Sequence, residues 1–139
     1  MTEVTYDTIN IGDEIPTFVS EPISRRTLAL YAGASGDHHP IHIDLDAAKA
    51  FGVDDVFAHG MLSMAYLGNM LINWVPQSQL RSFSNRFGSI THLKDQITCS
   101  GKVVEKFEEN GEKLARLEIT AANQDGDVKL AGQATVAFG

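Results

Sequence analysis

Histidine and aspartate side chains are concentrated between residues 34 and 64. Four of the five histidines of the chain lie there, together with several aspartates. Asp37 and His42 stand out, because Pro40 lies between them. On a helix their side chains would lie on different faces, whereas a loop bent by the proline allows them to converge. A carboxylate and an imidazole that both reach one water molecule can activate it and then return a proton near neutral pH.

Gly60 is the second candidate for chemistry, since it stands where the longest apolar helical pattern begins. Backbone N–H groups at the start of a helix have no partner within the helix, and the helix dipole is positive there. A residue without a side chain also lets a ligand carbonyl come close. Such an N–H can stabilise an oxyanion. A water-activating pair beside an oxyanion donor suits the addition of water to an activated double bond, or the reverse reaction.

Two short helices are predicted on either side of this pair. Ser24 is typical of a helix N-cap, and the helix that it begins is expected to stop at residues 33–36, where two glycines occur. Residues 37–43 should then be extended or looped, because a proline disfavours helix at the residue before it. Asp44 is expected to cap a second helix over residues 45–51, which Gly52 ends.

A third helix and a set of strands follow. The segment from about Gly60 to Val75, before Pro76, is apolar on nearly every side, and such a helix is normally buried in a domain core. After it the apolar residues alternate, which predicts strands. The dipeptides Asn110-Gly111 and Asp125-Gly126 favour tight hairpin turns between these strands. The expected strands cover residues 17–20, 82–90, 96–107, 115–121 and 128–138.

These elements predict an α+β fold, in which a curved antiparallel sheet wraps around one long central helix. The 139 residues are enough for one such domain, covering residues 1–139, and too few for two ordinary ones. One helix cannot cover every face and edge of the sheet. We therefore expect a second copy of the chain to pair with it in a dimer.

The composition argues against several classes of partner. A hydrophobic content of 43% and a charged content of 21% are values of a globular protein. The net charge of −7 offers no basic surface for nucleic acid. The sequence has neither the long apolar run of a membrane span nor the pattern of a signal peptide, and one cysteine cannot form an internal disulfide. We expect a cytoplasmic protein with no membrane or nucleic-acid partner.

Two runs of residues form the most specific motif in the chain: SGDHHPIHID at 35–44 and AHGM at 58–61. With Tyr31-Ala32 before them and Asn85-Arg86-Phe87 after them, the chain resembles the MaoC-like, (R)-specific enoyl-thioester hydratase and dehydratase family of hot-dog proteins. The pattern of that family is Asp-x-Asn-Pro-(Leu or Ile)-His, a short helix, and then His-Gly-Met opening the central helix. The spacing of this chain agrees with it throughout.

The resemblance implies a hot-dog fold, a dimer with one continuous sheet, and a substrate tunnel near the dimer interface. The implied reaction is reversible syn hydration of a trans-2-enoyl thioester, of coenzyme A or acyl carrier protein, to an (R)-3-hydroxyacyl thioester. It places the water-activating pair on Asp37 and His42, and the thioester-carbonyl donor on the backbone N–H of Gly60. No metal or redox cofactor is needed. The implied supporting residues are Tyr31, His39, Pro40 and His59.

The chain departs from the family pattern in two places. His39 stands where the family usually has asparagine, so a bulkier, titratable ring replaces an amide that orients the pair. This change bears on the pH profile and on substrate positioning. Residues 89–95 lack the prolines and the glycine of the Pro-Val-x-Pro-Gly-Asp element that is common in the family. That change bears on the rim of the tunnel and on partner contacts.

The same residues have other interpretations. His38, His39 and His42 with Asp44 could ligate zinc, but neither a helical HxxxH spacing nor a set of cysteines supports this. His59 is more typical of a structural histidine that locks the helix start than of an acid or base. Cys99 lies in a strand pattern, which favours buried packing over nucleophilic chemistry.

Two other functions stay open beside the hydratase hypothesis. The first is a hot-dog acyl-CoA thioesterase, which would release free thiol. The second is a non-catalytic or half-catalytic subunit that forms a hetero-dimer with another hot-dog chain. The departures at His39 and at residues 89–95 keep this second alternative open.

Overall fold

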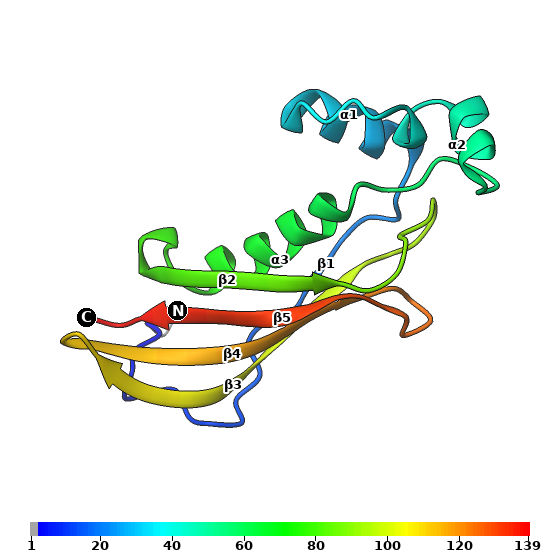
Figure 1. The fold of residues 1–139 in the computed structure, drawn as a ribbon. Coiled ribbons are helices and arrows are strands. Elements are labelled where there is room, and N and C mark those ends of the chain that lie inside the picture. The colour runs from blue at the N-terminus through cyan, green and yellow to red at the C-terminus, as the bar shows by residue number, and fades with distance from the viewer. Residues whose placement is uncertain (1–2) are drawn as a thin grey trace.

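The computed structural model describes residues 3–139 as a curved antiparallel sheet with a long helix along its concave face (Figure 1). The five strands follow the order β1-β3-β4-β5-β2, and every neighbouring pair is antiparallel. The α+β hot-dog prediction is confirmed. The strands are β1 (Phe18–Val19), β2 (Leu80–Phe87), β3 (Thr98–Glu109), β4 (Glu112–Ala122) and β5 (Val128–Ala137).

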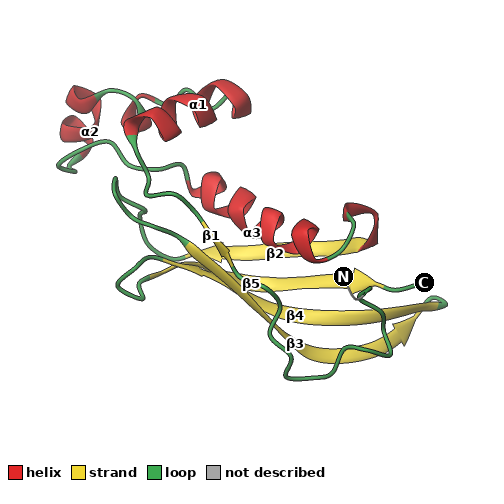
Figure 2. Cartoon of the chain, turned by 180° about the vertical axis from the view of Figure 1, so that it is seen from behind, coloured by secondary structure: helices red, strands yellow, loops and turns green. Residues whose placement is uncertain are grey.

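The three α-helices divide between two places. α3 (Gly60–Trp74) lies along the sheet, whereas α1 (Arg25–Ser35) and α2 (Leu45–Phe51) stand together beyond one end of it, as Figure 2 shows from behind. Two 3-10 turns, Pro40–His42 and Gln77–Gln79, complete the regular structure. Among residues 3–139, no helix combines the length and the apolar character that crossing a membrane requires.

Local capping explains the bounds of the two short helices. The Ser24 hydroxyl accepts a hydrogen bond from the Thr27 N–H, and Gly36 ends α1 in the left-handed conformation with φ 79°. The carboxylate of Asp44 likewise caps α2, which Gly52 ends with φ 107°. These caps were predicted. α1 continues through Gly33 to Ser35, because only the last of the nearby glycines takes the left-handed conformation that stops a helix.

The two hairpins of the sheet turn in different ways. Asn110 and Gly111 both have positive φ, as a tight two-residue turn requires. The turn between β4 and β5 was also expected to be tight, but it is a longer loop over residues 123–127. The side-chain oxygen of Asn123 accepts hydrogen bonds from the N–H groups of Asp125 and Asp127. This side chain replaces a backbone acceptor, which stabilises the longer loop.

Two hydrophobic cores hold these layers together. The larger joins the second half of α3 to the sheet, and its helical members Leu67, Met70 and Leu71 are almost fully buried. Cys99 belongs to this core, and burial raises the pKa of its thiol to about 12, in agreement with a packing role. The smaller core joins α1, α2 and the start of α3; its buried members are Ile23, Leu28, Ala48, Val56, Ala58 and Leu62. It positions the histidine-rich segment over the first turn of α3.

Candidate functional site

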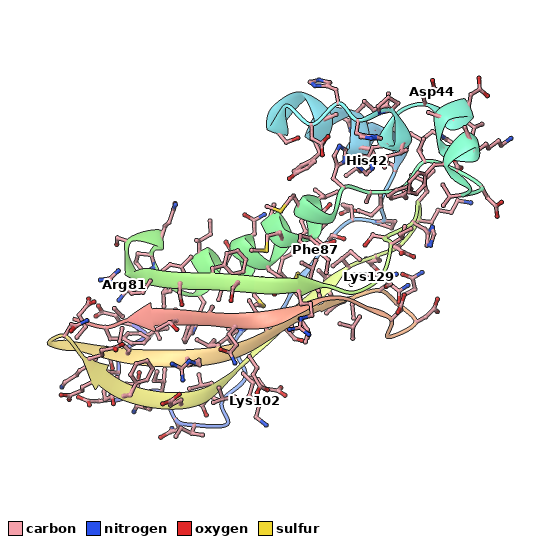
Figure 3. All side chains as sticks on the ribbon, viewed as in Figure 1. His42, Asp44, Arg81, Phe87, Lys102 and Lys129 are labelled. Carbon is pink, nitrogen blue, oxygen red and sulfur yellow. The ribbon has the colours of Figure 1, made fainter. Side chains whose placement is uncertain are left out.

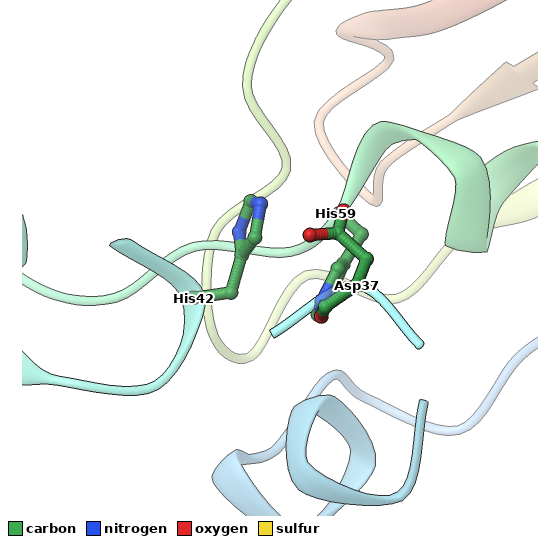
Figure 4. Close-up of side chains that lie close together, drawn as sticks. All are labelled: Asp37, His42 and His59. Carbon is green, nitrogen blue, oxygen red and sulfur yellow. The ribbon is translucent and has the colours of Figure 1, made fainter. Parts of the chain in front are cut away.

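Three side chains from separate segments converge where the helical end of the molecule meets α3 (Figure 4). Asp37 follows α1, His42 ends the 3-10 turn, and His59 directly precedes α3. One carboxylate oxygen and one nitrogen from each ring all lie within 4.8 Å of one another. The bend at Pro40 therefore brings Asp37 and His42 together.

The ring of His42 is held in one orientation by the backbone. Its Nδ1 lies 2.6 Å from the carbonyl oxygen of Phe57, and the side chain is buried. Because a carbonyl oxygen only accepts, Nδ1 carries the hydrogen, and Nε2 of the neutral ring is left as an acceptor. Burial lowers the pKa of His42, against the opposing effect of the Phe57 hydrogen bond. The ring is thus neutral near pH 7, with its basic nitrogen available.

His59 connects the start of α3 to the loop that carries Asp37. Its Nε2 donates to the backbone carbonyl of Asp37 at 3.0 Å, and its ring stacks on that of His42 with the centroids 4.0 Å apart. The rings of Tyr31 and His59 meet edge to face, with their centroids 4.9 Å apart. The pKa of Tyr31 is raised, first by burial and then by the charge of Asp37. His59 occupies the N-cap position without a side-chain capping bond, so its hydrogen bond serves the loop rather than the helix.

The loop around Asp37 is organised by short-range hydrogen bonds. The carboxylate of Asp37, which is exposed in the single chain, accepts from the N–H of His39 at 3.2 Å. His39 Nδ1 in turn accepts from the N–H of Ile41 at 3.2 Å and caps the 3-10 turn that Pro40 begins. An asparagine oxygen makes this kind of bond in an Asx turn. The ring of His39 therefore replaces the usual amide without loss of the turn. His38 is exposed.

Gly60 begins α3, and a side chain larger than hydrogen would not fit there. A Cβ at this position would lie 2.8 Å from Cε1 of Phe87. Figure 3 places Phe87 near the end of β2 that faces the start of α3. A cavity of about 240 Å³ lies beside the glycine. Its lining includes Phe57, Ala58, Gly60, Ser63, Phe87 and Leu130.

A buried lysine that the sequence pattern did not indicate holds the loop at residues 89–95, part of which lines this cavity. Lys129 is only 2% exposed, and its Nζ donates to the Ile90 carbonyl at 2.7 Å and to the Asp127 carboxylate at 2.6 Å. The carboxylate of Asp95 lies 3.6 Å away. Residues 89–95, which lack the family's prolines and glycine, are thus anchored from beneath by a cation. A lysine within the apolar alternation of β5 was the available signal.

His42 and Gly60 line different cavities of the single chain. His42 lies beside a cavity of about 220 Å³ whose other lining residues are Arg25, Ala29, Ile43 and Val56. The cavity beside Gly60 includes neither Asp37 nor His42. The segment 56–58 borders both cavities: Val56 lines the one beside His42, and Phe57 and Ala58 line the one beside Gly60. His59 connects Asp37 and His42 with Gly60, since its ring stacks on that of His42 and it directly precedes Gly60 in the chain.

The convergence of Asp37, His42 and His59 also raises the question of a metal ion. The set offers one carboxylate and two imidazoles, which are ligand types that zinc accepts. The two rings are stacked, however, with only 25° between their planes. Because the lone pair of a ring nitrogen lies in the ring plane, two stacked rings do not direct their lone pairs at one ion. The arrangement suits a hydrogen-bonded water better than a shared metal.

The comparison with known families agrees with the motif and the fold. Residues 8–124 match the model of the MaoC like domain. The chain belongs to this family. Over 135 residues it is also 30% identical to the fatty acid synthase subunit beta of Saccharomyces cerevisiae, a match that covers 92% of the chain but only 6% of that much longer protein.

Relatives of similar length are named as hydratases. The chain is 28% identical over 120 residues to the (R)-specific enoyl-CoA hydratase of Rhodospirillum rubrum, a match that covers 85% of the chain and 81% of the relative. Among solved structures, the R-hydratase PhaJ1 of Pseudomonas aeruginosa is 27% identical, with a TM-score of 0.84 over 96% of this chain and 84% of its own. Both of these relatives are named as hydratases, and each is less than 30% identical to the chain.

Proposed function

We propose that the protein catalyses the reversible syn hydration of a trans-2-enoyl thioester to an (R)-3-hydroxyacyl thioester. The observation that carries the proposal is the fixed ring of His42. Its Nδ1–H donates to the Phe57 carbonyl, and a carboxylate oxygen of Asp37 lies within 4.8 Å of one of its ring nitrogens. At this separation, one water molecule fits between the base and the carboxylate.

The separation itself supports a shared water. Within residues 3–139, no hydrogen bond joins the Asp37 carboxylate to the His42 ring directly. A water molecule that makes hydrogen bonds of about 2.8 Å to two groups at a tetrahedral angle spans about 4.5 Å between them. The water would donate one hydrogen to His42 Nε2 and the other to Asp37.

The reaction follows from this arrangement. His42 Nε2 takes a proton from the water, while the water oxygen forms a bond to Cβ of the substrate. The electrons of the C=C bond move toward the thioester carbonyl, whose oxygen becomes an enolate oxygen. The imidazolium then returns its proton to Cα on the same face, and the C=O bond reforms. Asp37 orients the water and stabilises the transient imidazolium, so both protein groups finish in their starting states.

Gly60 supplies the complementary charge in this proposal. Its N–H stands at the positive end of α3, where the enolate oxygen would be stabilised as charge develops on it. The close approach of the Phe87 ring to the glycine Cα means that no methyl group fits between ring and helix. A substrate carbonyl would therefore meet the backbone rather than a side chain.

We also propose that the working form is a dimer built along β2. In the described part of the chain this strand pairs with β5 on one side only, so its other edge carries free backbone groups. Exposed apolar side chains lie on this strand and on α3, among them Phe87, Met61 and Ile72. A second copy paired edge to edge would cover them and extend the sheet. Sedimentation at micromolar concentration should give twice the mass of one chain.

An assay of purified protein with crotonyl-CoA and longer trans-2-enoyl-CoA substrates tests the function. The enoyl absorbance should fall without release of free thiol, and the product should be the (R)-3-hydroxyacyl thioester. Release of thiol from acyl-CoA, with the enoyl absorbance retained, would instead identify a thioesterase. An (S) product would overturn the proposal. Turnover that appears only when another hot-dog chain is added would identify the chain as a half-catalytic subunit.

A further inference from the structure

Buried polar atoms without partners gather around the first turns of α3. Within residues 3–139, three buried side-chain atoms make no hydrogen bond: His59 Nδ1, Ser63 Oγ and Asn85 Oδ1. A buried donor or acceptor without a partner destabilises a protein, so natural proteins rarely retain such groups without a reason. Ser63 is the least expected of the three, since alanine would fit the same place without this cost.

The position of Ser63 connects it with Gly60. Residues three apart on a helix lie on the same face, and both line the cavity of about 240 Å³. The side chain of Ser63 is only 1% exposed. A serine within a helix commonly bonds the carbonyl oxygen four residues earlier. In the described chain Ser63 makes no such bond, and the carbonyl of His59 accepts from the N–H of Leu62 instead.

The rest of the cavity wall offers the hydroxyl little. Much of the lining is apolar, with Phe57, Phe87 and Leu130 among its members. The cation that lines it, Lys129, is already engaged by the Ile90 carbonyl and by Asp127. The Ser63 hydroxyl is therefore free to bond an atom that enters the cavity. Such an atom would lie at the positive end of α3, which favours an oxygen that carries or gains negative charge.

We propose that the Ser63 hydroxyl binds the thioester carbonyl oxygen of the substrate, as a second donor beside the N–H of Gly60. This inference rests on the proposed hydratase function and assigns a further group to its oxyanion site. An alkyl chain gains nothing from a hydroxyl, whereas an enolate oxygen gains a hydrogen bond that strengthens as its charge develops. The cost of the unsatisfied hydroxyl in the free protein is repaid when substrate binds.

The variant Ser63→Ala separates this role from a structural one. In the free protein it removes an unsatisfied buried hydroxyl, so the melting temperature should stay the same or rise. The value of kcat/KM for a trans-2-enoyl thioester should nevertheless fall by about 10²-fold, as for loss of one oxyanion donor. The matched control is Ser100→Ala, whose hydroxyl pairs with Thr120 at the surface. This control should leave kcat/KM unchanged. A lower melting temperature with unchanged kcat/KM would overturn the proposal.

Calorimetry with two ligands identifies the atom that is bound. 3-Hydroxybutyryl-CoA has the thioester carbonyl, and the thioether analogue has a methylene group in its place. Ser63→Ala should weaken binding of the thioester by about tenfold and leave binding of the thioether unchanged. Equal weakening of both ligands would place the hydroxyl on another part of the substrate and overturn the inference. Because binding needs no turnover, wild-type protein that binds both ligands but hydrates no enoyl thioester would contradict the hydratase proposal separately.

Discussion

The first turn of α3 and its second half lie in contrasting surroundings. In the second half, Leu67, Met70 and Leu71 are 0–1% exposed and pack on the sheet as part of the larger core. At the first turn, Gly60 and Ser63 face a cavity, and unsatisfied polar atoms are buried nearby. The second half of α3 is thus fully packed by the rest of the protein, whereas its first turn borders a cavity that the protein leaves unfilled.

This contrast shows which half of α3 stabilises the fold and which end keeps polar groups at a cost in stability. Burial of a large apolar side chain adds about 1.5–3 kcal/mol to the free energy of unfolding, and several residues in the second half of α3 each contribute in this way. A buried polar group without a partner acts in the opposite direction. Sites that must bind a ligand commonly retain such groups at a cost in stability. The second half of α3 thus stabilises the fold, whereas its first turn keeps buried polar groups that lower the stability of the free protein.

The largest effect is expected from Asp37→Asn. The carboxylate is exposed, so the free energy of unfolding should change by less than about 0.5 kcal/mol. Loss of a carboxylate that orients the water and stabilises the imidazolium should lower kcat by about 10²–10⁴-fold. Initial rates with crotonyl-CoA and urea denaturation measure the two quantities. His42→Gln should give a similar loss of kcat, and full activity in both variants would remove them from the mechanism.

Leu71→Ala, at the other end of α3, should lower stability and have little effect on activity. Its side chain is fully buried against the sheet, so the cavity left behind should lower the free energy of unfolding by about 2–5 kcal/mol. At a temperature where the variant is folded, kcat/KM should stay within about twofold of the wild type. Urea denaturation and steady-state kinetics on the same preparation check this. A large loss of kcat/KM would mean that the two ends of the helix are coupled.

A matched pair of glycine substitutions tests the contrast within one helix. Gly60→Ala forces its methyl group against the Phe87 ring, and should lower stability by about 1–3 kcal/mol and kcat/KM by about 10²-fold. Gly68→Ala meets only an ordinary contact, 3.8 Å from Cε1 of Phe83, and should raise stability by about 0.5–1 kcal/mol. Thermal unfolding and kinetics measure both.

Removing the Phe87 ring tests whether Gly60→Ala acts by crowding that ring or by blocking access of the substrate to the backbone N–H. The double variant Gly60→Ala with Phe87→Ala should recover the stability that the contact with the ring cost. Its kcat/KM should remain low if the methyl group itself occupies the approach to the backbone N–H. Recovery of kcat/KM together with stability would show that the glycine is required for packing alone.

The smallest effect concerns pH. Burial lowers the pKa of His42 below its ordinary value of 6.5, so the acidic limb of kcat/KM should have its midpoint below pH 6.5. As the pH falls, His42 therefore takes up a proton at a higher pH in the unfolded chain than in the folded chain. His42 therefore contributes to stability above pH 6.5, and this contribution is lost as pH falls through the folded pKa. In His42→Gln the fall in stability between pH 6.5 and 5 should be shallower, as urea titrations at each pH would show.

Much of the fold could be predicted because its signals are local. Ser24 and Asp44 cap their helices through side-chain bonds to residues two or three positions away, and Asn110-Gly111 supplies the positive φ of a two-residue turn. The turn at Asp125-Gly126 was expected to be tight, but hydrogen bonds to the side chain of Asn123, just before the dipeptide, stabilise a longer loop. The ends of the strands also differ from the expected ones, because partner strands decide where pairing stops.

The sequence by itself determined which residues are the candidates for chemistry: the spacing of Asp37, Pro40, His42 and Gly60 is a property of the chain and indicated the family. Only the tertiary structure decided which nitrogen of His42 is free, since its partner is the carbonyl of Phe57, fifteen positions away. It also decided that Lys129 anchors the loop at 89–95 and that Ser63 has a buried hydroxyl with no partner. The physical reason is the same in each case. Burial and hydrogen-bond satisfaction depend on segments that only folding brings together.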